Sequence, residues 1–128
     1  MMTNSGQLKN GWSIIITVGD MEPWYFLEGW ERQIKEHLTF DNKEEAIHAF
    51  VEIVKSYRKR FHFSKTKGSS IACFWNEGDE VYCDACDEYV QVFHGILLFY
   101  HNHLFQPNTK DKNIFALLES TKMIENVE

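Results

Sequence analysis

At 128 residues, 44% of them hydrophobic and 25% charged, the chain has the length and composition of one globular domain, which excludes two domains and global disorder. Its 10 Phe, 5 Tyr and 4 Trp residues supply ample side chains for one core. The net charge of -6 excludes a surface built throughout to bind the phosphate backbone of nucleic acids, because that task needs an excess of basic residues.

The N-terminal residues, the apolar runs and the cysteines predict where the protein is located. Residues 1–10 are polar, lack the basic and apolar segments of a secretory signal, and are expected to be a flexible segment. The longest strongly apolar run, residues 96–100, is far shorter than the roughly 18 residues that cross a bilayer. Three cysteines do not make the disulfide framework of a secreted domain, so reduced thiols are expected. We therefore expect a cytoplasmic protein with no membrane partner.

Two segments in the first third of the chain alternate between apolar and polar residues, as strands with one buried face do. They are residues 12–18 and 34–40. Between them, Pro23 predicts a turn, and the aromatic run 24–27 predicts either a further strand or an extended loop.

The hydrophobic period changes to that of a helix at Asp41. This residue is the predicted N-cap, because Glu44 follows three residues later in the arrangement of a capping box. The predicted helix covers residues 42–60. Its apolar face, expected to pack against a sheet, contains Ile47, Phe50, Val54 and Tyr57, and Phe61 follows at the same spacing.

The second half of the chain is predicted to complete an antiparallel sheet. The apolar segment 71–75 is typical of a central strand. Segments 89–93 and 96–105 predict a β-hairpin with its connection at His94-Gly95.

The predicted elements define an α+β fold. We expect one domain over residues 11–105, in which an antiparallel sheet of about five to six strands packs against one long helix. The tail, residues 106–128, is polar until Asp111, which is the predicted N-cap of a short C-terminal helix.

The sharpest local motif is Cys83-Asp84-Ala85-Cys86. Two residues between cysteines allow both sulfurs to bind one metal ion or to form a reversible disulfide. The pair supplies half of a zinc site, and the candidates for the other ligands are Cys73, His94, His101 and His103.

The alternatives to zinc at these cysteines are structural thiols and redox work. One observation favours zinc: if residues 96–105 form one strand, His101 and His103 project from the same face at a spacing that suits one ion. One observation favours structural thiols: Cys73 lies in an apolar strand, where a buried thiol is ordinary. Redox work is disfavoured because the neighbouring acidic residues oppose formation of the thiolate.

Charge is divided into two poles along the sequence. Residues 55–67 contain six Lys or Arg and no acid, whereas residues 77–88 contain six Asp or Glu and no base. The basic pole either marks a helix end and a solvated loop or binds a partner. The candidate partner-binding residues are Arg58, Lys59, Arg60, Lys65, Lys67, Trp24 and Trp30, although both Trp side chains are also typical of a core.

No motif for catalysis is evident. None of the six histidines stands at a recognisable spacing from a nucleophile, and neither a P-loop nor a GxGxxG motif occurs. The sequence therefore favours a protein without enzymatic activity, with zinc as the one cofactor that its residues suggest.

Several short motifs carry a family resemblance. They are Gly19-Asp20, Glu22-Pro23-Trp24, Glu28-Gly29-Trp30, Phe74-Trp75, Cys83-x-x-Cys86-Asp87 and Phe93-His94-Gly95. Together they resemble a family of small proteins from low-GC Gram-positive bacteria, domain of unknown function 1033, over residues 12–100. The resemblance implies a small cytoplasmic bacterial protein and transfers no catalytic residue.

Three functions follow as hypotheses. The leading one is a noncatalytic binding or adaptor domain with a partner expected to be a protein, because opposed charge poles and many aromatic residues occur without a catalytic constellation. The second is a zinc-stabilised domain built on Cys83 and Cys86. The third is a nucleic-acid accessory protein that uses the basic segment 55–67.

Overall fold

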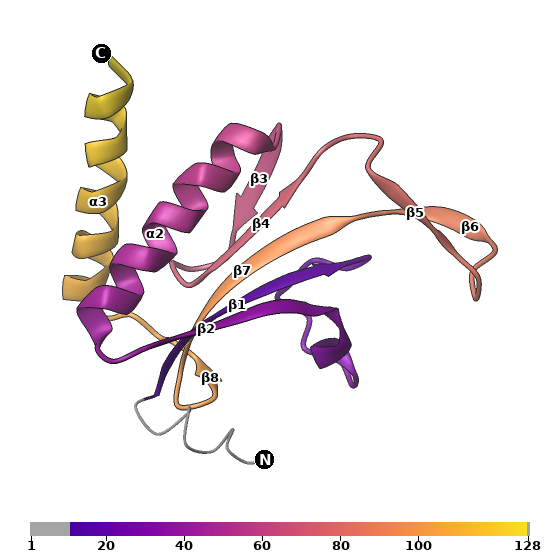
Figure 1. The fold of residues 1–128 in the computed structure, drawn as a ribbon, viewed down its shortest axis with the longest axis horizontal. Helices are drawn as coiled ribbons and strands as arrows, with labels where there is room; N and C mark the ends of the chain where they lie inside the picture. Colours follow the sequence, from indigo (N-terminus) through magenta and orange to yellow (C-terminus); the bar gives the residue numbers. More distant parts are fainter. Residues whose placement is uncertain (1–10, 128) are drawn as a thin grey trace.

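The structure, a computed structural model, describes residues 11–127 and combines a curved antiparallel sheet with two helices on one side (Figure 1). The predicted flexible segment 1–10 lies outside the described residues. The strands of the large sheet are β1 (Trp12–Gly19), β2 (Ile34–Phe40), β3 (Phe63–Thr66), β4 (Ile71–Trp75), β7 (Phe93–Tyr100) and β8 (His103–Leu104). The remaining elements are η1 (Trp30–Gln33), α2 (Lys43–Arg60), β5 (Glu80–Cys83), β6 (Glu88–Gln91) and α3 (Thr109–Val127).

The predicted α+β fold is confirmed. The large sheet has the order β2-β1-β7-β4-β3, with β8 paired to β7, and all of its pairings are antiparallel. Strands β1 and β7 form its centre, in a register that runs from Trp12 opposite Tyr100 to Gly19 opposite Phe93. Strands β5 and β6 form a separate two-stranded hairpin that projects away from the large sheet (Figure 1).

The long helix forms where its period predicted, but its N-cap is Asn42 and not Asp41. The Asn42 side chain accepts a hydrogen bond of 2.9 Å from the backbone N–H of Glu45 and so satisfies one free donor of the first turn. Ile47, Phe50 and Val54 are buried against the sheet, and Tyr57 packs at the edge of the same core. The predicted apolar face of the helix is therefore confirmed.

The sheet has a core on each of its two faces, because its central strands are apolar in both directions. The core under the helices contains Trp12, Ile14, Ile16, Ala46, Ile47, Phe50, Val51, Val54, Ala72, Phe74, Ile96, Leu98 and Phe115. The smaller core on the opposite face contains Ile15, Ile71, Leu97 and Phe99, with Trp24, Trp30, Ile34 and Leu104 packed against it. The segment between β1 and β2 is thus a loop that covers this second face, and not a strand.

The C-terminal helix is capped by a reciprocal pair of hydrogen bonds. The Asp111 N–H donates to the Asn108 side chain (2.8 Å), and the Asn108 N–H donates to the Asp111 carboxylate (3.1 Å). Asn108 is therefore the N-cap, and Asp111, which the sequence analysis assigned to that position, lies three residues later. The helix packs against α2, where the rings of Phe115 and Phe50 meet edge to face.

The predicted hairpin between residues 89–93 and 96–105 is wrong. Strand β7 runs without interruption through His94 and Gly95, and β6 pairs with β5 instead. The chain reverses later, at His101 and Asn102, which both have positive φ angles, and β8 then pairs back onto β7. Gly95 serves close packing rather than a turn: a Cβ atom there would lie 2.5 Å from the Pro23 Cβ.

Candidate functional site

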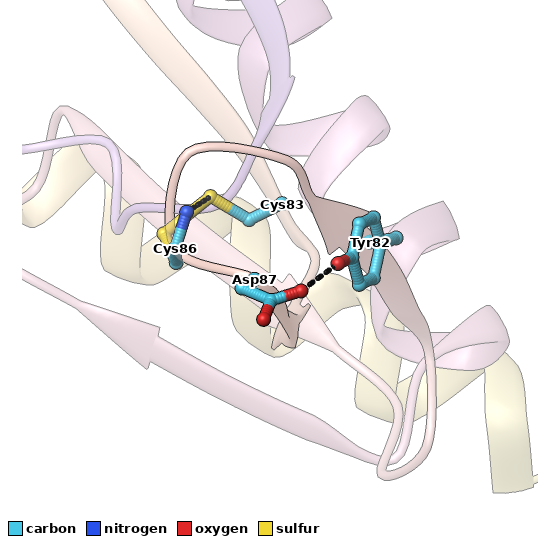
Figure 2. Close-up of a disulfide and its surroundings, with 4 residues drawn as sticks. All are labelled: Tyr82, Cys83, Cys86 and Asp87. Atoms are coloured by element: carbon cyan, nitrogen blue, oxygen red, sulfur yellow. Dashed lines mark hydrogen bonds between the residues drawn. A yellow bond between two sulfur atoms is a disulfide. The ribbon is translucent and has the colours of Figure 1, made fainter.

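The two cysteines of the CxxC motif lie at the tip of the β5–β6 hairpin. They form a disulfide between Cys83 and Cys86, with the two Cα atoms 5.3 Å apart (Figure 2). Reduced thiols were expected, and this expectation is wrong for the pair because the tight turn between β5 and β6 brings both sulfurs together. Cys86 is exposed, whereas Cys83 is half-buried.

The backbone of this turn is held by local hydrogen bonds. The Cys86 N–H donates to the Cys83 Sγ (3.2 Å), and the Asp87 N–H donates to the Cys83 carbonyl (2.7 Å). Asp87 adopts a left-handed conformation with φ 58°, and its carboxylate accepts a hydrogen bond from the Tyr82 hydroxyl (Figure 2). This bond to a carboxylate raises the pKa of Tyr82, because it stabilises the neutral phenol.

The remaining predicted zinc ligands are dispersed. Cys73 is fully buried in β4, and burial raises the pKa of its thiol to about 12. The His94 ring lies 3.4 Å from the Asp79 carboxylate and packs on Phe61. Among the residues that the structure describes, no group of three or more His, Cys, Asp or Glu side chains is placed to hold a metal ion.

His101 and His103 do not share a face of one strand, contrary to the sequence analysis. His101 lies in the turn after β7, where its ring packs on Tyr100, and His103 begins β8. The six predicted ligands therefore do not form one site, and of these residues Cys83 and Cys86 are the pair that the fold joins.

The basic pole of the sequence is divided among separate places in the fold. Arg58 forms an ion pair with Glu119 of α3. The Arg60 guanidinium lies over the Tyr57 ring, 4.7 Å from its centroid, on the helical side of the molecule. Lys59 is exposed at the end of α2. The predicted cluster is thus not one continuous patch.

Lys65 and Lys67 instead reach the opposite side of the sheet, where they meet Trp24. Their ammonium groups lie 5.5 and 5.8 Å from the centroid of the Trp24 ring, within the range of cation–π attraction. Lys65 also lies 3.7 Å from the Glu22 carboxylate. Of the seven predicted partner-binding residues, these two lysines and Trp24 are brought into contact.

The loop that carries Trp24 exposes large apolar side chains. Tyr25, Phe26 and Leu27 are 49%, 42% and 54% exposed, and Met21 is also exposed. We call Met21, Trp24, Tyr25, Phe26 and Leu27 the loop surface. Sequence reasoning considered the stretch from Asp20 to Tyr25 as a recognition surface and selected Trp24 and Trp30, but it missed Phe26 and Leu27. The signal for them was the run of four consecutive large apolar residues, 24–27, because one buried face of a strand takes only every second residue.

Trp30 contributes to the walls of two hollows beside the loop surface. One, of about 190 Å³, is lined in part by Met21, Tyr25, Leu27 and Trp30. The other, of about 310 Å³, is lined in part by Phe26, Trp30 and Phe99. Trp30, a predicted partner-binding residue, therefore packs on the second core and also lines both hollows.

A family model described as a protein of unknown function, DUF1033, matches residues 12–126. The chain belongs to this family. The match extends beyond the range over which the sequence motifs resemble DUF1033 and includes nearly all of α3. No curated protein and no solved structure matches the chain. None of the helices in the described residues has the length and apolar character needed to span a membrane.

Proposed function

We propose that this DUF1033 protein is a noncatalytic binding domain that takes a protein segment on its loop surface. The observation that carries the proposal is the position of Lys65 and Lys67 over Trp24, at the border of exposed apolar side chains. Aromatic anchors beside basic residues suit a partner segment that has apolar side chains and acidic neighbours.

The apolar part of the surface supports a protein rather than a small polar ligand. Tyr25, Phe26 and Leu27 are consecutive, and each is more than two-fifths exposed. Clustered exposed aromatic and aliphatic side chains are characteristic of protein interfaces. The two hollows that Trp30 lines are of a size to accept single side chains of a partner.

The distribution of charge favours a protein over a nucleic acid as the partner. Arg58 and Arg60 are held on the helical side, by Glu119 and by Tyr57, and only Lys65 and Lys67 of the predicted basic residues approach the loop surface. Two cations neutralise few phosphates, so a nucleic acid would be bound weakly at physiological salt.

Binding to an array of twelve-residue peptides tests this function. Three sets of peptides are compared. The first contains a Leu/Phe pair flanked by Glu, the second contains the same pair flanked by Lys, and the third has Ala in place of the pair and keeps the flanking Glu. We expect binding to the first set alone, and a loss of about tenfold in affinity on Tyr25→Ala/Leu27→Ala.

The matched control is Val81→Ala/Tyr89→Ala, which removes an aliphatic and an aromatic side chain from the hairpin that are 50% and 68% exposed. It should leave peptide binding unchanged. Equal binding to all three peptide sets, or an equal loss in the control variant, would contradict the proposal.

A further inference from the structure

The β5–β6 hairpin holds a reactive group that the proposed binding surface does not use. Its disulfide lies in a projecting arm, with Cys86 exposed to solvent and Cys83 half-buried. Three carboxylates lie in the five-residue stretch 84–88 that contains Cys86 and follows Cys83, those of Asp84, Asp87 and Glu88. All three residues are exposed, and no basic residue occurs between residues 77 and 88.

We propose that Cys83–Cys86 is a reversible disulfide that is reduced in preference by thiol compounds whose remaining groups are neutral or positively charged. The attacking thiolate forms its first bond with the Cys86 sulfur. In this role the pair is the substrate of thiol–disulfide exchange, not its catalyst. The neighbouring carboxylates disfavour a nucleophilic thiolate on the hairpin, but they do not prevent an external thiolate from attacking an exposed sulfur.

The direction of attack follows from the two sulfur environments. Cys86 is the exposed residue of the pair, so an external thiolate reaches its Sγ more readily and forms a new S–S bond there, while the Cys83–Cys86 bond breaks. The electron pair leaves on the Cys83 Sγ, where the hydrogen bond from the Cys86 N–H stabilises the developing negative charge.

A second external thiolate completes the reaction. It attacks the external sulfur of the mixed disulfide, which releases the oxidised external disulfide and leaves a thiolate on Cys86. Both cysteine thiolates then take protons from solvent, which received them from the two external thiols. The hairpin disulfide gains two electrons, and the two external thiols lose them.

Charge at the hairpin tip selects among thiols. A thiolate that carries a second negative charge is repelled by Asp84, Asp87 and Glu88, whereas a thiolate that also carries an ammonium group is not. The carboxylates are exposed, so each acts weakly through water, and together the three are expected to produce a rate ratio of about tenfold at low salt. The ratio should shrink at high salt, because the carboxylates are exposed and screened.

Reduction of the folded, full-length protein by cysteamine and by 3-mercaptopropionate tests the proposal. Each rate constant is calculated per concentration of thiolate and divided by the rate constant of the same reagent with a small uncharged disulfide. This normalisation removes the difference in thiol pKa and nucleophilicity between the two reagents. We expect cysteamine to be faster by about tenfold at low salt and the ratio to approach one at 1 M salt. Quenching by rapid alkylation and peptide mapping should place the external thiol on Cys86 and the alkyl group on Cys83.

Two double variants test the source of the selectivity. Asp84→Asn/Glu88→Gln should lower the cysteamine preference by several fold. Glu31→Gln/Glu36→Gln, which changes net charge equally at exposed positions outside the hairpin, should leave it intact. The proposal is overturned if the hairpin disulfide resists both reagents until the protein unfolds, if the two rates agree at low salt, or if the mixed disulfide forms mainly on Cys83.

Discussion

The Lys43 ammonium lies 2.7 Å from a carboxylate oxygen of Asp111, and this ion pair joins the first turn of α2 to the first turn of α3. The Asp111 side chain is almost fully buried, whereas that of Lys43 is half-exposed. The same carboxylate also accepts the Asn108 N–H, so one side chain caps α3 and fastens it to α2.

Replacement of Asp111 by Ala is expected to lower the free energy of unfolding by about 2 kcal/mol, because it removes a charged hydrogen-bond acceptor and half of the capping box. The loss stays moderate because Lys43 can regain water. Urea denaturation measures the difference, and Asn113→Ala, an exposed position in the same turn, is the control. Equal stabilities of the two variants would contradict the assigned role.

Protonation of Asp111 at low pH should weaken its contact with Lys43. Burial would raise the pKa of Asp111, but the hydrogen bonds from Lys43 and Asn108 and the charges of Lys43 and Lys110 outweigh it, so the pKa lies below its ordinary 3.8. The stabilisation is therefore complete above pH 3.8 and is lost as pH falls through the lowered value. The stability difference between wild type and Asp111→Asn should be constant near neutral pH and shrink below pH 3.8, as measured by urea denaturation across pH.

Gly95 should not tolerate a side chain. A Cβ atom there would lie 2.5 Å from the Pro23 Cβ and 2.5 Å from the Thr17 Oγ1. Gly95→Ala is expected to cost about 1–3 kcal/mol in the free energy of unfolding and to displace the loop that carries Trp24. Thermal denaturation and intrinsic Trp fluorescence measure both effects. Gly78→Ala is the control: a Cβ there would meet no atom within 4 Å, so its φ of 88° should cost stability but leave Trp fluorescence unchanged. Unchanged Trp fluorescence in Gly95→Ala would contradict the assigned contact.

The Cys73 thiol should not react with thiol reagents in the folded protein. Its side chain is 0% exposed, and its pKa is raised to about 12 by burial and by the Glu22 carboxylate, against a smaller lowering by Lys65. The thiol therefore stays neutral at pH 8, and a thiol reagent should label no cysteine of the native oxidised protein. Unfolding without reductant should expose one reactive thiol. Labelling of the native oxidised protein at the rate of a free thiol would show that Cys73 is accessible.

The elements that the sequence predicted well are those whose signal is periodic and local. The spacing of Ile47, Phe50 and Val54 identified the buried face of α2 because a helix repeats every 3.6 residues regardless of its neighbours. Caps were assigned less well: Asp41 and Asn42 are adjacent and chemically similar, and only the backbone angles decide which one accepts the N–H.

The pairing of β7 and the candidate site could not be read from local residues. Gly95 is equally typical of a turn and of a strand that another segment approaches, and the contact with Pro23, far away in sequence, decides between them. The sequence likewise grouped Arg58 with Lys65. In the fold Arg58 lies at the end of α2 and pairs with Glu119 of α3, whereas Lys65 lies on β3 and approaches Glu22 on the opposite side of the sheet. The CxxC motif was identified correctly, but its state depends on the geometry of the turn.

The central place of β7 sets the order in which the sheet can be assembled during synthesis. Segments 12–40 and 63–75 each contain a pair of neighbouring strands, but these two pairs meet only through β7, whose Tyr100 lies opposite Trp12. Until residues 93–100 have left the ribosome, β1 and β4 each present an unpaired edge and α2 lacks much of the surface against which it packs. A chain that ends before Phe93 would keep those edges open, and open edges pair readily with other molecules.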